Sequence, residues 1–293
     1  MFPDVTRTPV DADALSRYTS ERQFTALAHD LLREAASYVC LASCIMGEQP
    51  TWNRNQAIIG GNAVRIFKLL ASLLDQVVQD RRETVDILSR LVFETAVNVR
   101  YLAQEWTEAL ANDYVRHSLR HERKLSDTID RNIKARKGEV LPIEDRMRES
   151  LERTARGAGV RLKDVDLSDK APWGKQHLAQ KAKTVGWEDA YDAVFGGMSH
   201  NVHGSWQDLY THHLEMDDQG RFTPDLGWSR PRPQPLLALA TIAIQVAADV
   251  STKLGGAEAF DSLSQKLNDL DDRIRTVDKA HENYLQQRKW PAT

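Results

Sequence analysis

Groups able to move protons at neutral pH are concentrated in one stretch of the chain, residues 191–214. Four of the nine histidines lie in this stretch, and they are His200, His203, His212 and His213. Imidazole changes charge near about pH 6.5, which suits it to general acid–base catalysis. On a helix, residues three and four apart are neighbours, so His203 would lie beside both Ser199 and His200. We predict that Ser199, His200 and His203 are catalytic residues and that Trp206 is a binding residue.

A serine nucleophile is the first chemistry that these residues suggest, because Ser199 would lie beside an imidazole base. Serine catalysis also needs an orienting acid and an oxyanion hole. The chain has no Gly-x-Ser-x-Gly turn that would provide the usual strand–turn–helix setting. The sequence therefore disfavours a serine hydrolase.

A metal centre is the second chemistry. The histidines of this stretch, together with Asp208 and Glu94, offer nitrogen and carboxylate ligands of the kinds that bind zinc. However, no His-Glu-x-x-His motif occurs, and the spacing matches no common metal framework. A metal-dependent hydrolase is kept as an alternative, while our main expectation is a protein with no metal and no other cofactor.

Ribonuclease chemistry of the HEPN kind is the third. Here an arginine and a histidine four to six residues apart on one helix act on an RNA phosphate, the arginine stabilising charge and the histidine moving protons. Arg116 and His121, in the sequence RHSLRH, fit this spacing. They open a basic region, residues 116–156, with twelve Lys and Arg against eight Asp and Glu. Such regions are usually solvated helix faces, but this one is also a candidate phosphate-contacting surface. Two further pairs fit the spacing loosely: Arg22–His29 and Arg275–His281.

A stripe of polar side chains follows the helix predicted at residues 83–111. Its members are Arg90, Glu94, Asn98 and Tyr101, which fall in about one quadrant at 100° per residue. The stripe is either the solvated face of a core helix or the wall of a polar pocket. In the second case Arg90 and Glu94 would form an ion pair, and Arg65 of the preceding helix would add charge to the same pocket.

Apolar residues recur at three- and four-residue steps along most of the chain, which predicts helices. The main predicted helices are 11–46, 53–80, 83–111, 141–156, 235–253 and 257–288, with a loop at 215–235 and no strand. In the last helix apolar positions from Leu263 to Tyr284 follow a heptad pattern, which packs either on the chain's own bundle or on a second copy. The predicted fold class is all-α, a single bundle of about seven to nine helices.

The predicted domain organisation is one compact unit in three parts. Residues 1–50 hold an N-terminal helix that packs on the bundle. Residues 51–255 form the core helical domain, and residues 256–293 form the heptad-patterned helix.

Composition is that of an ordinary globular protein. The 293 residues are 41% hydrophobic and 28% charged with a formal net charge of −3, so no global field points to nucleic acid or to an anionic membrane. The most apolar run, 236–250, is shorter than the roughly 18–20 residues that span a bilayer. The N-terminus lacks the apolar core of a signal peptide. Cys40 and Cys44 are interpreted as small apolar residues of a reduced protein. We expect a cytoplasmic protein that does not contact a membrane.

Five short motifs carry a resemblance to a known family. They are QAIIGGNAVRIFKLL, SRLVFETAVNVRYL, PIEDRMRES, WGK and SHNVHGSWQDL, and they span about residues 52–235. In this order and spacing they resemble the domain of unknown function 5677 family of bacterial helical proteins. The specific positions are Arg90, Glu94, Asn98, Tyr101, Ser199, His200, His203, Gly204 and Trp206. The resemblance implies an all-α fold in which the helix of Arg90 and Glu94 packs near the helix of Ser199 and His203. It implies no activity. A weaker analogy, to HEPN-like helical ribonucleases, rests on helical architecture.

The main functional hypothesis is a nucleic-acid-acting effector of bacterial stress or phage defence, a metal-independent ribonuclease with RNA as its partner. In it His203 is the general acid or base, Arg90 binds the phosphate, and Glu94 orients either. Arg116 and His121 are a rival pair. These roles require Arg90, Glu94 and His203 to meet in a centre withdrawn from water.

Two alternatives remain open. The first is a non-catalytic interaction or sensor protein that binds a partner, or a second copy as a homodimer, through residues 257–288. The second is the metal-dependent hydrolase.

Overall fold

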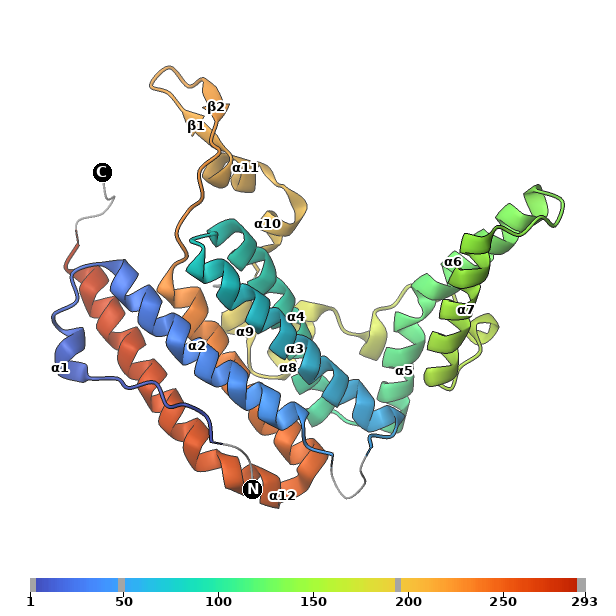
Figure 1. Ribbon diagram of the computed structural model, residues 1–293, viewed down its shortest axis with the longest axis horizontal. Coiled ribbons are helices and arrows are strands. Elements are labelled where there is room, and N and C mark those ends of the chain that lie inside the picture. The colour runs from blue at the N-terminus through green and yellow to red at the C-terminus, as the bar shows by residue number, and fades with distance from the viewer. Residues whose placement is uncertain (1–3, 47–50, 193–195, 289–293) are drawn as a thin grey trace.

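The protein has the all-α fold that its sequence predicts. The structure is a computed structural model and describes residues 4–46, 51–192 and 196–288. Within these residues, seven helices of more than ten residues carry the architecture. They are α2 (Glu21–Ser43), α3 (Arg54–Val78), α4 (Arg82–Gln104), α5 (Glu108–Ser118), α6 (Arg120–Ala135), α7 (Pro142–Gly157) and α12 (Pro233–Gln286). Figure 1 shows α2, α3, α4 and α12 packed as the main bundle, with α6 and α7 projecting from it.

The bundle helices begin where the sequence supplies a capping residue and then bury one apolar face. Before α3, the Asn53 side chain accepts the N–H of Gln56, and the Gln56 side chain accepts the N–H of Asn53. The side chains of Phe24, Ile66 and Phe93, from α2, α3 and α4, are fully buried in one core. Burying a side chain of this size stabilises the fold by roughly 1.5–3 kcal/mol, so helix packing outweighs local propensity.

The two C-terminal helices predicted at 235–253 and 257–288 are both parts of α12. The backbone bends at Gly256, where φ is +72°, a conformation that glycine adopts without steric cost. Before the bend α12 lies against α4, where Arg100 Nη1 donates to Gln245 Oε1 at 2.7 Å. After the bend it runs along α2 as far as His281, which packs beside Phe24.

The heptad positions of α12 pack against other helices of the same chain. Leu263, Leu267, Leu270, Ile274 and Val277 are at most 3% exposed. They pack with α2 in the core of the main bundle. Of the two packings that the pattern allows, the structure therefore shows the one on the chain's own bundle. Binding of a partner through residues 257–288 stays a prediction, and it would have to use the outer faces of this helix.

The helices α6 and α7 form an arm that projects from the main core, whereas α5 buries Ala111 and Val115 in that core (Figure 1). Ile129, Ile133 and Leu151 make a small separate apolar cluster between α6 and α7. The ion pair of Arg136 with Glu144 also joins the two helices. Part of the basic character of this region is therefore neutralised within the arm.

Short elements make up the chain between α7 and α12. They are the 3-10 turns η1 (Leu162–Asp164) and η2 (Trp173–Lys175), α8 (Leu178–Thr184), α9 (Glu188–Ala190), α10 (Ser199–His203), α11 (Trp206–His212), β1 (Leu214–Met216) and β2 (Phe222–Pro224), and α1 (Ala12–Leu15) precedes α2. The strands pair antiparallel with Leu214 opposite Pro224. The prediction of no strand and of a loop throughout 215–235 was wrong in this part. The Asp217 side chain accepts the N–H groups of Gln219 and Arg221, which closes the hairpin turn.

Two helices, α3 and α12, are long and apolar enough to cross a membrane by length and composition alone. Their most apolar windows are 44% and 61% buried against the rest of the chain. A core helix of a water-soluble bundle has the same composition, because it is apolar around most of its circumference. A cytoplasmic location without membrane contact stays a prediction.

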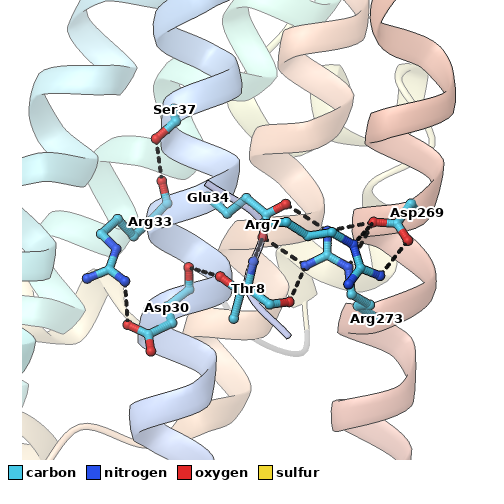
Figure 2. A network of polar contacts seen from close by, with 8 residues as sticks. All are labelled: Arg7, Thr8, Asp30, Arg33, Glu34, Ser37, Asp269 and Arg273. Carbon is cyan, nitrogen blue, oxygen red and sulfur yellow. Dashed lines mark hydrogen bonds and ion pairs between the residues drawn. The ribbon is translucent and has the colours of Figure 1, made fainter. Parts of the chain in front are cut away.

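A buried ion-pair network joins the N-terminal segment and α2 to α12 (Figure 2). Arg273 donates to both carboxylate oxygens of Glu34, at 2.8 and 2.7 Å. The N–H of Thr8 donates to Glu34 at 2.7 Å, while Asp269 accepts from Arg7 and Arg273. The side chains of Glu34 and Arg273 are only 1% and 7% exposed. Each of these two charges therefore depends on the other for compensation.

The adjacent glycines of α3 differ in their surroundings, which yields a matched test of packing. A Cβ on Gly60 would lie 2.4 Å from the indole ring of Trp52, whereas a Cβ on Gly61 would meet nothing within 4 Å. We expect Gly60→Ala to destabilise the protein by about 1–3 kcal/mol through overpacking. Gly61→Ala should stabilise it by up to about 1 kcal/mol, the helix-propensity gain. Urea unfolding of both variants would check this, and equal effects would contradict close packing at Gly60.

Candidate active site

The structure places the three expected catalytic groups, Arg90, Glu94 and His203, in different environments. Arg90 is half-buried on α4 with its guanidinium carbon 5.4 Å from the ring centroid of Tyr191. Glu94 and His203 are exposed, and neither forms a hydrogen bond or ion pair with a described residue. The helix α10 does pack on α4, as the resemblance implies, but its polar contact is with Asp86, one turn before Arg90. The expected centre withdrawn from water is therefore not formed by these three residues. Their functional roles stay predictions.

The last residue of the α4 stripe, Tyr101, faces α8 and is not part of a solvated face. Asn98 is half-buried, and Tyr101 is buried with its ring centroid 5.6 Å from Lys181 Nζ. Lys181 is 3% exposed, and its Nζ lies 3.1 Å from the ring centroid of Trp173. Burial lowers the pKa of Lys181 to about 8. Tyr101 thus belongs to a cluster in which aromatic rings surround the amine of Lys181. The predicted binding residue Arg65 is exposed on α3.

The rival pair Arg116 and His121 does not lie on one helix. The helix α5 ends at Ser118 and α6 begins at Arg120, with the cap residue Leu119 between them. Both side chains are exposed, and Arg116 Nη1 donates to the carbonyl of Asp164 at 3.2 Å. The spacing expected for a helix-borne pair is therefore interrupted, and the role of these two residues stays a prediction.

The histidine-rich stretch divides into an exposed part and one buried histidine. Ser199 is half-buried, His200 is exposed, and Trp206 is 61% exposed. His212 on α11 is only 5% exposed. Across residues 4–46, 51–192 and 196–288, no group of three or more His, Cys, Asp or Glu side chains lies close enough together to hold a metal ion. The expected ligand set for a metal-dependent hydrolase is therefore not assembled by these residues.

The structure does form a polar pocket, which lies at the start of α4, one turn before Arg90. It has a volume of about 350 Å³ and is walled by α4, α10, α11 and the segment that enters α12. We name it the acid–base pocket, defined by Arg82, Asp86, Asn201, His212 and Arg232. It brings together two guanidinium groups, a carboxyl group, an amide and an imidazole. Arg82 and Asp86 come from α4, and the other three residues come from a part of the chain more than a hundred residues later.

Hydrogen bonds and ion pairs fix the walls of this pocket. Asn201 Nδ2 donates to Asp86 Oδ2 at 3.2 Å, and Arg82 Nε lies 3.6 Å from the same oxygen. His212 Nδ1 lies 3.4 Å from Glu83 Oε1. In the described part of the chain, His212 Nδ1 and Gln234 Oε1 are buried atoms without a hydrogen-bond partner. Buried polar atoms left unpaired cost about 1–3 kcal/mol each, so the pocket wall is built at an energetic cost.

Burial dominates the titration of Asp86. It raises the pKa of this carboxyl group to about 6, although Arg82, Arg232 and the Asn201 hydrogen bond act in the opposite direction. Burial also lowers the pKa of His212, and the charge of Arg82 lowers it further. The pocket therefore holds a carboxyl group that keeps its proton up to nearly neutral pH beside an imidazole that is neutral there.

The raised pKa of Asp86 predicts a pH-dependent effect on stability. Below about pH 4 the carboxyl group is protonated in both the folded and unfolded states and costs nothing. As pH rises from about 4 to 6, the carboxyl group ionises in the unfolded state while burial keeps it protonated in the folded state, so stability is lost, and the loss is complete once pH has passed 6. Asp86→Asn removes this loss. Its unfolding free energy relative to wild type should rise by about 3 kcal/mol between pH 4 and pH 8. Urea unfolding at both pH values would test this, and a pH-independent difference would contradict the burial of an ionisable Asp86.

Sequence reasoning did not predict Arg82, Asp86, Asn201 and Arg232 as site residues, and it named His212 only as a metal ligand. A usable signal existed for Asp86. It lies three and seven residues before Ser89 and Phe93, both fully buried, so it occupies a core-facing row of α4. Acidic side chains are rarely buried, so a carboxyl group in a core-facing row seldom serves to stabilise the fold.

The fold and the pocket define the class of protein. It is an all-helical bundle with a polar pocket at the junction of α4, α10, α11 and α12. More particularly, the chain belongs to the family of unknown function DUF5677, whose model matches residues 56–221. This confirms the family resemblance. No curated protein and no solved structure matches the chain. The matched range contains Arg82, Asp86, Asn201 and His212, whereas Arg232 lies beyond it. The analogy to HEPN ribonucleases stays a prediction.

Proposed function

We propose that the protein is a metal-independent ribonuclease that acts in bacterial stress or phage defence, and that its active site is the acid–base pocket. The observation that carries the proposal is Asp86, a buried carboxyl group whose pKa is raised to about 6 beside two arginines. A carboxyl group in an exposed structural ion pair behaves in the opposite way. The pKa of Asp269, for example, is lowered by its hydrogen bond with Arg7. Strongly perturbed groups in a cleft are candidates for acid–base chemistry.

The two arginines give the pocket an affinity for phosphate. Arg82 is largely buried, with 23% of its side chain exposed, while Arg232 is exposed at the rim. Planar guanidinium groups bind phosphate oxygens through paired hydrogen bonds, and they remain charged at every physiological pH. A bound phosphodiester would bring a negative charge near Asp86. It would raise the pKa of that carboxyl group further, so the complex would hold Asp86 in its protonated form.

These groups suffice for transesterification of RNA. His212 accepts the proton of the ribose 2′-hydroxyl as its oxygen bonds to phosphorus. Asp86 donates its proton to the 5′-oxygen as the P–O bond breaks. Arg82 and Arg232 stabilise the charge that develops on the phosphoryl oxygens. The products are a 2′,3′-cyclic phosphate and a free 5′-hydroxyl. At the end of the step His212 carries a proton and Asp86 is ionised.

Cleavage of end-labelled single-stranded RNA in EDTA tests the proposal. We expect the wild-type protein to produce 2′,3′-cyclic phosphate ends, and a substrate with 2′-deoxyribose at every position to remain intact. His212→Ala should abolish cleavage, whereas His203→Ala and His121→Ala should retain it. If activity is lost only with His203→Ala or His121→Ala, the site lies elsewhere. If the wild type cleaves nothing, the enzyme proposal fails and the non-catalytic alternative stands.

The proposed role in defence has its own readout. Induced expression of the wild-type chain in a bacterial host should arrest growth and fragment cellular RNA, because an unrestrained ribonuclease depletes its substrate. His212→Ala at the same protein level should permit growth. Arrest by both forms would show that toxicity does not come from the pocket.

A further inference from the structure

A second cavity shares Arg232 with the acid–base pocket. Its volume is about 340 Å³, and four arginines line it: Arg22, Arg230, Arg232 and Arg288. They come from the start of α2, the segment that enters α12, and the end of α12. We name it the arginine cavity. Because Arg232 lines both cavities, the two are adjacent.

The positive charge of the arginine cavity is only partly compensated. Arg230 Nε lies 3.8 Å from Asp80 Oδ2, and Arg288 Nη1 lies 3.7 Å from Glu21 Oε2. Among the residues that the structure describes, no other acidic side chain lines the cavity. Arg22 and Arg232, in contrast, form no hydrogen bond or ion pair with any residue that the structure describes. In the described part of the chain, two carboxylates thus line this concave surface together with four guanidinium groups. Such a concentration of like charge attracts anions and raises their local concentration.

The hydroxyl groups around this cavity are already engaged with the protein. The Tyr284 hydroxyl donates to the carbonyl of Thr19, and Thr25 Oγ1 donates to the carbonyls of Glu21 and Pro231. The free donors that remain are therefore guanidinium N–H groups. These suit an oxyanion with several acceptor oxygens better than a neutral polar ligand.

We propose that the arginine cavity holds a second phosphate of the same RNA strand whose scissile phosphate lies in the acid–base pocket. This inference rests on the proposed function and adds to it the class of substrate. A ligand that uses both cavities through Arg232 must carry at least two anionic groups along its length, and a polynucleotide chain has one per residue. Positively charged grooves that follow the backbone are the usual means of holding single-stranded nucleic acid. The substrate is therefore a strand of several nucleotides, not a mononucleotide or a dinucleotide.

Binding of 2′-O-methyl RNA, which lacks the attacking hydroxyl, tests this inference without cleavage. Fluorescence anisotropy would compare a twelve-nucleotide strand with a dinucleotide carrying a single phosphate, over a series of salt concentrations in EDTA. Arg22→Ala removes an exposed arginine of the cavity, so the fold should persist. Arg275→Ala is the matched control, because it removes the same charge from an exposed position of α12 that lines neither cavity.

We expect Arg22→Ala to weaken binding of the strand about tenfold and to reduce the slope of log K against log salt by about 0.7, the value for one phosphate contact on a single strand. Arg275→Ala should change the affinity less than twofold. For the dinucleotide, wild type and Arg22→Ala should be equal. An unchanged slope with Arg22→Ala, or equal weakening of the dinucleotide and the strand, would overturn the second phosphate site. Failure of the proposed function looks different: the strand binds with these slopes, but RNA with free 2′-hydroxyls stays intact.

Discussion

Replacing Asp86 by asparagine is expected to lower the rate of RNA cleavage by a factor of about 100 to 10,000, the range that a general acid contributes. The asparagine can still accept the hydrogen bond that Asn201 donates to Asp86, so the walls of the pocket should persist. It has no proton to give to the leaving oxygen. Because the variant also avoids ionising a buried carboxyl group, it should be more stable than wild type above pH 6. A loss of activity with a gain of stability distinguishes catalysis from misfolding.

Asp249→Asn is the matched control for this prediction. Asp249 on α12 is another carboxyl group whose pKa is raised by burial, and it lies 3.6 Å from Arg100, outside the acid–base pocket. We expect its replacement to change cleavage less than twofold. Single-turnover rates measured with saturating enzyme would compare the two variants. Similar losses in both would indicate a general effect of buried carboxyl groups and would remove Asp86 from the chemistry.

The second large effect concerns the network of Figure 2. Glu34→Ala is expected to lower the free energy of unfolding by about 3–5 kcal/mol, because it leaves the buried Arg273 guanidinium without its main partner. Arg273→Met should cost a similar amount by stranding Glu34. Since the two side chains act as one unit, the double variant Glu34→Leu with Arg273→Met should recover most of the loss.

Chemical unfolding of the single and double variants would measure this coupling. Arg275→Ala again provides a control, since Arg275 is an exposed arginine on the same helix whose pair with Asp271 should contribute little to stability. Strictly additive losses in the double variant would show that Glu34 and Arg273 contribute separately. In that case the ion pair would not be what joins α2 to α12.

The helical architecture could be predicted from the sequence because the pattern that defines it is local. Three- and four-residue steps located α2, α3, α4 and α12, and the heptad pattern identified the face of α12 that packs on α2. The bend at Gly256 joins two helices that the pattern separates, since a break in periodicity does not reveal whether the chain turns away or continues. The hairpin at 214–224 is too short for its alternation to stand out from a loop.

The site was predicted only in part, because it depends on how distant segments dock. The family motifs pointed correctly to contact between α4 and α10, but the position along α4 was displaced by one turn. Asn201, not His203, points to α4, and its partner is Asp86, not Arg90. The register between two packed helices is set by side-chain fit across the whole interface. A sequence pattern on either helix alone does not encode it.

The dependence of cleavage on pH tests the central claim most directly. If Asp86 is the general acid and His212 the base, the second-order rate of cleavage at subsaturating concentrations, which reports the pKa values of the free protein, should be highest in mildly acidic solution. It should fall about tenfold per pH unit above 6, as Asp86 loses its proton. The descending limb should be absent from the residual activity of Asp86→Asn. A wild-type rate that stays constant or rises between pH 6 and pH 8 would contradict acid catalysis by Asp86 and, with it, the assignment of this pocket as the active site.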